Sequence, residues 1–136
     1  MSFGGIPVYA VGAAAAAGFL FGALWYTVLG KAWMAAASVT EVQAKPTAAV
    51  MVMTFACQLV MAGVLAGVIF HTQPAVGGMS TKTGLIAAAL VWLGFIATAL
   101  AVNHRFQGRP WALTFIDGGH WLGVLMVQAV VVTLLS

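Results

Sequence analysis

The chain has 136 residues, of which 63% are hydrophobic and only 5% are charged, with a mean hydropathy of +1.09. Soluble domains are about 25% charged, so this composition excludes a water-soluble globular domain and predicts a protein embedded in a lipid bilayer. The net charge of +3 rests on five scattered bases, too few for a nucleic-acid interface. The single cysteine, Cys57, rules out an intrachain disulfide and a CxxC redox or metal motif.

Four apolar stretches follow one another along the chain. A helix needs about 20 apolar residues to cross the hydrocarbon core, and no water at that depth can bond the backbone, so we expect each stretch to be helical. The first stretch follows no base and exceeds a signal-peptide core of about 7–15 residues, so we expect it to be retained. The predicted fold is an all-α integral membrane four-helix bundle in a single domain, with spans at about residues 6–29, 47–70, 83–102 and 111–135.

The bases are shared unevenly among the connections between spans. Counting Lys and Arg, the first and third connections together hold four, and the second holds one. The positive-inside rule then predicts that connections one and three face the cytoplasm of a bacterial inner membrane and that both termini face the periplasm. The residues expected to anchor the inner boundary are aromatic or basic: Trp25, Tyr26, Lys31, Trp33, Arg105, Arg109 and Trp111.

The connections also carry local signals. Residues 31–37 are apolar but short, which predicts a short interfacial helix after the first span. Ser38 and Glu41 have the spacing of a capping box that restarts a helix, with a plain loop as the alternative. Pro74 and Gly77–Gly78 predict the turn between spans two and three.

A short pattern occurs twice at the predicted inner boundary. Residues 30–33 and 108–111 both read Gly-base-x-Trp. This fits two helical hairpins repeated about an axis along the membrane normal. The alternative is that any inner boundary favours glycine, a base and tryptophan.

Three glycine pairs have the small-xxx-small spacing that lets helix backbones approach closely in lipid. Four short helices bury little surface inside one another, so we expect a second copy to cover part of the remainder and the protein to be a homodimer. The pairs are Gly18 and Gly22, Gly63 and Gly67, and Gly119 and Gly123.

Polar residues form one stripe on span four and another on span two. Helical spacing places Thr114, Asp117, His120, Trp121 and Gln128 on one side of span four, and Thr54, Cys57, Gln58 and Met61 on one side of span two. Counting from the inner boundary puts the two stripes at similar depth. We therefore predict that they face each other inside the bundle, with Thr98 of span three close to Asp117.

Asp117 is the acid embedded in an apolar run. An ionised carboxylate at that depth is unfavourable by about 2.5–3.5 kcal/mol on insertion scales, so it must be protonated, paired or hydrated. His120, one turn away, is the nearest candidate partner, and Arg105 or Arg109 could reach it from the third connection. The stripe is either a proton relay or substrate-binding dyad, or a structural network that fixes helix register.

The histidines do not have the spacing of a metal or haem site within one chain. His71 belongs to the outer connection, His104 to the inner one, and His120 to a span. We therefore expect no cofactor and no metal, with a haem shared by two His120 side chains of a dimer as the alternative.

Short blocks along the chain resemble a known family. In these blocks, and over nearly its whole length, the chain resembles the bacterial membrane family catalogued as domain of unknown function 1761. The resemblance implies a small four-helix integral membrane protein and brings no activity, cofactor or catalytic residue. It also implies that position 120 is often an aromatic such as tyrosine, which makes Asp117 the better candidate for a shared role. The blocks are Trp25-Tyr26, Gly30-Lys31-Ala32-Trp33-Met34, Trp92-Leu93-Gly94-Phe95, Phe106-x-Gly108-Arg109-Pro110-Trp111 and Asp117-Gly118-Gly119-His120-Trp121-Leu122.

Two functions fit the sequence. The first is non-enzymatic: a small integral membrane protein that acts as a homodimer or as an accessory subunit of a larger membrane assembly, because the sequence contains no convincing nucleophile–base pair. The alternative is a transporter or channel for protons or a small solute that uses the polar stripe around Asp117.

Overall fold

The computed structural model describes residues 1–3 and 5–136, and its described part is built from four long helices. All four are long and apolar enough to cross a membrane, so the chain is a multi-pass, all-α four-helix membrane bundle. The long helices are α1 (Val8–Ala37), α3 (Ala48–Thr72), the continuous third span of α4 (Thr81–Val91), η2 (Trp92–Ala97) and α5 (Thr98–Phe106), and α6 (Trp111–Leu134). The short elements are β1 (Ser2–Phe3), which pairs with β2 (Ile6–Pro7), α2 (Glu41–Ala44) and η1 (Gln73–Val76).

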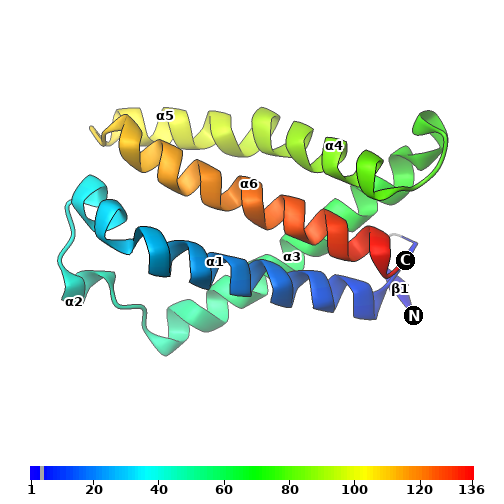
Figure 1. Ribbon diagram of the computed structural model, residues 1–136, viewed down its shortest axis with the longest axis horizontal. Helices are drawn as coiled ribbons and strands as arrows, with labels where there is room; N and C mark the ends of the chain where they lie inside the picture. The colour runs from blue at the N-terminus through cyan, green and yellow to red at the C-terminus, as the bar shows by residue number, and fades with distance from the viewer. Residues whose placement is uncertain (4) are drawn as a thin grey trace.

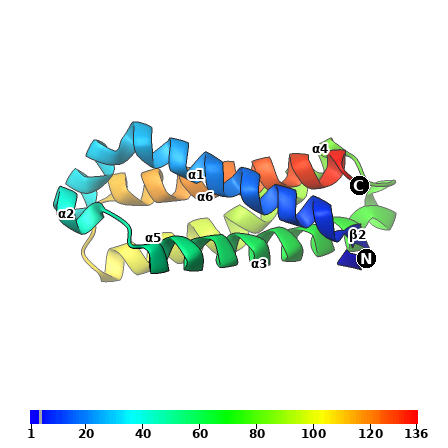
Figure 2. The same ribbon diagram turned by 90° about the horizontal axis from the view of Figure 1, so that it is seen from below.

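The two ends of the bundle differ in what they carry. Both termini lie at one end, whereas α2 and the turn between α5 and α6 lie at the other (Figure 1). The prediction that connections one and three share one side is therefore confirmed for the fold. Helix α6 packs against α1, α3 and α4, and the two views together show it beside α1 along most of its length (Figure 2).

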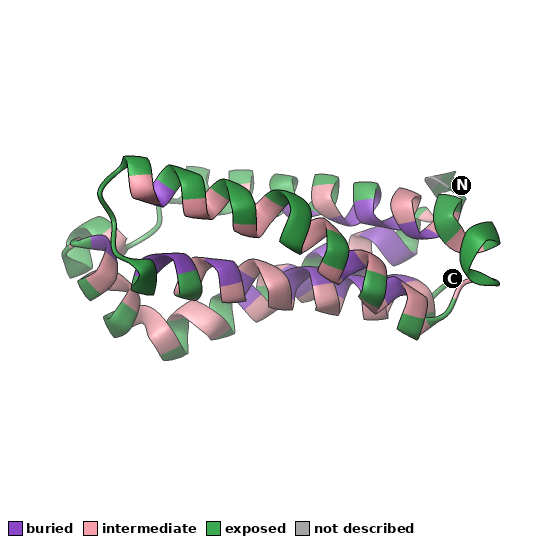
Figure 3. Ribbon diagram, turned by 90° about the horizontal axis from the view of Figure 1, so that it is seen from above, coloured by how far each residue is buried: buried purple, intermediate pink, exposed green. Residues whose placement is uncertain are grey.

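Small residues fill the interior, and large apolar residues cover the outside. The buried residues follow the inner faces of the helices (Figure 3). Small interior residues let helices pack closely in lipid, and large outward side chains contact acyl chains. Residues with no exposed surface include Ala10, Ala14, Ala62, Ala66 and Ala129, whereas Leu20, Val28, Val60, Phe95 and Phe115 are all more than 60% exposed.

The first connection differs from its prediction. Helix α1 continues without a break to Ala37, so residues 31–37 extend the first span and do not form a separate interfacial helix. Ser38 ends α1 in a left-handed conformation with φ 58°, so it cannot also begin the next helix. The capping box is instead made by Thr40 and Gln43 at the start of α2.

The second connection agrees with its prediction. Pro74 lies in the first turn of η1, and Gly77 and Gly78 follow with φ 80° and 118°. These angles favour glycine because a side chain would be strained there. A feature that the sequence did not indicate is η2, a π-helical turn in the middle of the third span.

Candidate functional site

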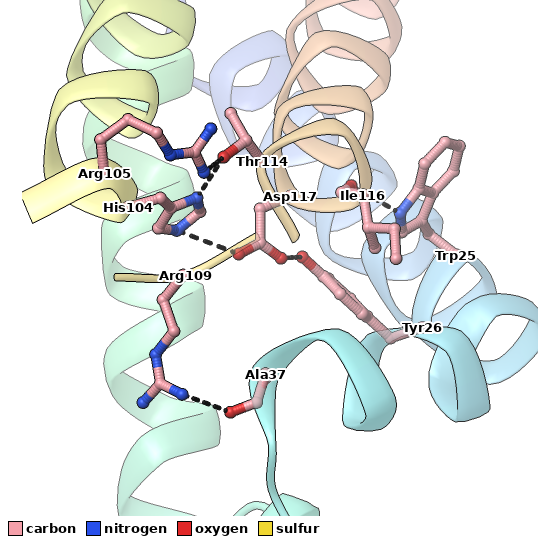
Figure 4. A network of polar contacts seen from close by, with 9 residues as sticks. All are labelled: Trp25, Tyr26, Ala37, His104, Arg105, Arg109, Thr114, Ile116 and Asp117. Atoms are coloured by element: carbon pink, nitrogen blue, oxygen red, sulfur yellow. Dashed lines mark hydrogen bonds and ion pairs between the residues drawn. The ribbon is translucent and has the colours of Figure 1, made fainter. Parts of the chain in front are cut away.

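Asp117 on α6 receives contacts from two other helices (Figure 4). Tyr26 of α1 donates a hydrogen bond from its hydroxyl group to Asp117 Oδ1 at 2.7 Å. His104 of α5 places Nε2 at 3.7 Å from Asp117 Oδ2. The carboxylate therefore joins α1, α5 and α6 at the level where the third connection begins.

A second layer of contacts orients His104. Arg105 donates from Nη2 to Thr114 Oγ1 at 2.7 Å, and Thr114 Oγ1 lies 2.8 Å from His104 Nδ1. With Oγ1 accepting from arginine, the threonine hydroxyl proton is free to donate to Nδ1, and in that tautomer the imidazole proton is on Nε2, facing Asp117. The Arg105 guanidinium also stacks on Trp111, 3.7 Å from the ring centroid. Figure 4 shows this chain of groups directed at Asp117.

This arrangement corrects three predictions. His120 is not the partner of Asp117, because its Nδ1 is buried without a hydrogen-bond partner in the structure as described. His104 does not belong to the third connection: it lies on α5, is 7% exposed and faces Asp117. Thr98 is exposed and donates to Gly94 O of its own helix, so it is not a member of the Asp117 cluster. The π-helical turn just before it widens the helix, and this turn changes which face the following residues present.

The two predicted stripes do meet further along the bundle. Gln128 Nε2 donates to Gln58 Oε1 at 2.8 Å, and both side chains are at most 1% exposed. Thr54 is half-buried and bonds Val50 O of its own helix. Cys57 is exposed and does not belong to the inward stripe. The prediction that the stripes of α3 and α6 face each other is therefore confirmed for Gln58 and Gln128.

The paired glycines mostly leave room for side chains of other helices, whereas we expected them to let helix backbones approach each other. A Cβ on Gly22 would lie 2.7 Å from His120 Nε2, and one on Gly119 would lie 2.9 Å from the Trp25 ring. A Cβ on Gly18 would lie 2.6 Å from Gln58 Oε1. Gly67 has no such neighbour. The glycines thus make room for the polar and aromatic groups of the site.

Most of the residues predicted to anchor the inner boundary donate hydrogen bonds to other helices. Trp25 donates from Nε1 to Ile116 O at 3.0 Å, and Arg109 donates from Nη1 to Ala37 O at 2.9 Å. Lys31 is exposed, as expected of a residue at the boundary. Tyr26 was predicted as an anchor, and its hydrogen bond to Asp117 was missed. The two residues are 91 positions apart, and a single sequence does not indicate which distant residues are in contact.

A cavity of about 810 Å³ lies beside the Asp117 cluster, between α1, α2, α3 and α6. Its volume is within the range of about 300–1,000 Å³ that is typical of small-molecule sites. Most of its surface is apolar or aromatic, with a few polar groups. The cavity lining includes Phe19, Tyr26, Trp33, Glu41, Lys45, Thr54, Gln58, Asp117, His120 and Trp121.

The described residues contain no group of three or more His, Cys, Asp or Glu side chains placed to hold a metal ion. The expectation that the protein uses no metal and no cofactor stays a prediction.

Comparison with known proteins identifies one family. The model of the family described as "Protein of unknown function (DUF1761)" matches residues 9–133. No curated protein and no solved structure matches the chain. The matched segment contains all four long helices, the Asp117 cluster and the cavity, apart from the first and last residues of the bundle. The chain therefore belongs to the DUF1761 family.

Proposed function

We propose that this protein is a small, non-enzymatic transport protein of the bacterial inner membrane, which works as a homodimer and carries a small solute through its cavity. The observation that supports this most is the cavity of about 810 Å³, which has an apolar wall and a few inward polar groups. A purely structural bundle would not need such a space.

The depth of the cavity favours transport. The lining runs from Glu41 and Lys45 in the first connection to Gln58 on α3. Gln58 is ten residues beyond the first residue of α3, Ala48, which corresponds to about 15 Å at 1.5 Å per residue. A hydrocarbon core is about 30 Å thick, so a solute in the cavity would be about half-way across.

The Asp117 cluster supports a proton-linked version of this function. Tyr26 and His104 hold the carboxylate from two helices, and Thr114 and Arg105 stand behind His104. A solute that binds the carboxylate beside Tyr26 and His104 would act on a group that α1, α5 and α6 share. Binding in the cavity would then be coupled to helix position.

The mutation Thr54→Trp tests the function, because Thr54 lines the cavity and is not one of the residues that contact Asp117. We expect purified protein in liposomes to move ethidium, 8-anilinonaphthalene-1-sulfonate or protons faster than protein-free liposomes do. Thr54→Trp should lower that flux at least about tenfold, since the solute site is occluded. Ethidium and anilinonaphthalene fluorescence and internal pyranine report the three fluxes.

The matched control is Val60→Trp, on the same helix at a position 66% exposed to the outside. This variant should retain the flux of the wild type. Flux of none of the three probes, or equal flux through the wild type and Thr54→Trp, would remove the proposal.

Orientation and oligomeric state form the last part of the proposal. Four of the five Lys and Arg residues, Lys31, Lys45, Arg105 and Arg109, lie in or beside connections one and three, which favours a cytoplasmic position for this end of the bundle. The third span supports a second copy, because only 6% of the residues in its most apolar window are buried within one chain. That face carries Gly94, where a Cβ would have no neighbour within 4 Å.

Single-cysteine variants in a Cys57→Ala background test both points. We expect Gln73→Cys, in the second connection, to react with a membrane-impermeant maleimide added to intact spheroplasts, and Gln107→Cys to react only in inverted vesicles. We expect Thr98→Cys, on the exposed face of α5, to give a disulfide-linked dimer on mild oxidation. Reversed labelling contradicts the orientation, and a chain that stays monomeric contradicts the dimer.

A further inference from the structure

We infer that the cavity binds lipophilic organic cations, such as aromatic amines in their protonated form. This inference rests on the proposed function, since it names the class of solute that the same cavity would carry.

The distribution of charge in the chain is the first argument. The sequence contains only two acidic residues, and its net charge is +3. Both acids, Glu41 and Asp117, line this one cavity, together with a single base, Lys45. A chain that is basic overall therefore presents a net negative wall to the space inside it, and this favours a cationic ligand.

The two carboxylates lie at different depths. Glu41 is exposed on the short helix α2, at the end of the bundle where the connections lie. Asp117 lies inside, and its side chain is 19% exposed. A cation arriving from the connection end would meet Glu41 first and Asp117 second. An attractive field along this path would raise the rate of entry.

Aromatic side chains form the second argument. Phe19, Tyr26, Trp33 and Trp121 all line the cavity. The Tyr26 and Trp33 rings lie edge to face with centroids 5.9 Å apart. The faces of aromatic rings attract cations, with the largest effect where water is excluded. Apolar walls with aromatic faces and one embedded carboxylate suit an apolar body that carries a positive charge.

His120 supplies the third argument. It lines the cavity, is 6% exposed, and its Nδ1 has no hydrogen-bond partner among the described residues. An unpaired buried polar atom is unfavourable, and a ligand N–H group would pair with it. The Tyr26 and Trp121 rings flank His120, with centroids 4.8 and 4.5 Å from the imidazole.

Asp117 can accept a cation without losing its present contacts. An ionised carboxylate has about four lone-pair positions on its two oxygens. Tyr26 donates to Oδ1, and His104 faces Oδ2 at a longer distance. A ligand cation would take a remaining position and add to the set of donors around the carboxylate.

Binding of two ions with the same shape and opposite charge tests the inference. The probes are tetraphenylphosphonium and tetraphenylborate, measured by equilibrium dialysis against wild-type protein in nanodiscs of zwitterionic lipid. Empty nanodiscs correct for partition into lipid, because the interfacial dipole potential acts differently on the two ions. We expect saturable binding of the cation and at least about tenfold weaker binding of the anion.

Two variants locate the site. We expect Asp117→Asn to weaken cation binding at least about tenfold, because it removes the charge partner inside the bundle while keeping an oxygen that accepts from Tyr26. Glu41→Gln should weaken binding less, since that carboxylate is exposed to solvent. The comparison of the two ions on wild-type protein does not depend on the folding of any variant.

The outcomes separate this inference from the proposed function. Equal saturable binding of both ions, or a preference for tetraphenylborate, overturns the cation inference, and the transport proposal stands if Thr54→Trp still blocks flux of the anionic probe. Cation binding that Asp117→Asn and Glu41→Gln both leave unchanged also overturns it. Absence of saturable binding of either ion, together with absence of any probe flux, overturns both.

Discussion

Adding one methyl group at Gly123 is expected to destabilise the bundle by about 1–3 kcal/mol, the usual effect of overpacking a tight interior. A Cβ at this position would overlap the ring of Phe21 on α1. The ring also packs against Trp25, with centroids 5.8 Å apart, so a shift of the ring would disturb that contact. The added methyl would therefore push α1 and α6 apart along their shared contact.

The measurement is unfolding of Gly123→Ala by SDS in mixed micelles, followed by tryptophan fluorescence. The matched control is Gly118→Ala on the same helix, where the nearest side-chain atoms to an added Cβ lie at 3.9 Å and 4.0 Å, an ordinary contact distance. That variant should be close to the wild type. If the two variants have the same stability, α1 and α6 do not pack as described.

Removing the carboxylate of Asp117 is expected to have the second large effect on stability. Asp117→Ala leaves the Tyr26 hydroxyl without its acceptor and removes the carboxylate that faces His104 Nε2 at 3.7 Å. A hydrogen bond to a charged group contributes about 1.5–3 kcal/mol, and leaving its partner buried and unpaired adds to the loss. We expect Asp117→Ala to lower the free energy of unfolding by about 2–3 kcal/mol, and Asp117→Asn to lower it by less.

A double-mutant cycle with Tyr26→Phe measures the contact itself. If the hydroxyl acts through Asp117, the double variant should be more stable than the sum of the two single losses implies. Additive losses would mean that Tyr26 and Asp117 do not interact, and the cluster would then need another description.

The sequence was sufficient for the four spans and for their order. Apolar runs near 20 residues long fix the number of spans, and prolines 7 and 110 and the paired glycines 77 and 78 lie where helices begin or end. The inward facing of Gln58 and Gln128 was also predictable from helical spacing, but their pairing was not, because counting from the inner boundary puts Gln58 closer to the depth of His120.

The partners of Asp117 were not predictable in the same way. His120 is one turn away in sequence, but its ring lies against Tyr26 and Trp121. His104 reaches the carboxylate because it lies on the last turn of α5, which is still packed inside the bundle. The charged residues of that segment had indicated a connection between spans. Thr98 was misplaced because counting residues gives depth along a helix but does not give the face after a π-helical turn.

The length of α1 decides from where a solute would enter. Its 30 residues measure about 45 Å along the axis, whereas the hydrocarbon core is about 30 Å thick, so its last turns extend into the lipid headgroup layer. Trp33 and Met34, which line the cavity, lie on these turns. Under the proposed function, the entrance would lie among phosphates and glycerol groups, so an amphiphile already dissolved in the adjoining leaflet would reach it by sideways diffusion, without first returning to water.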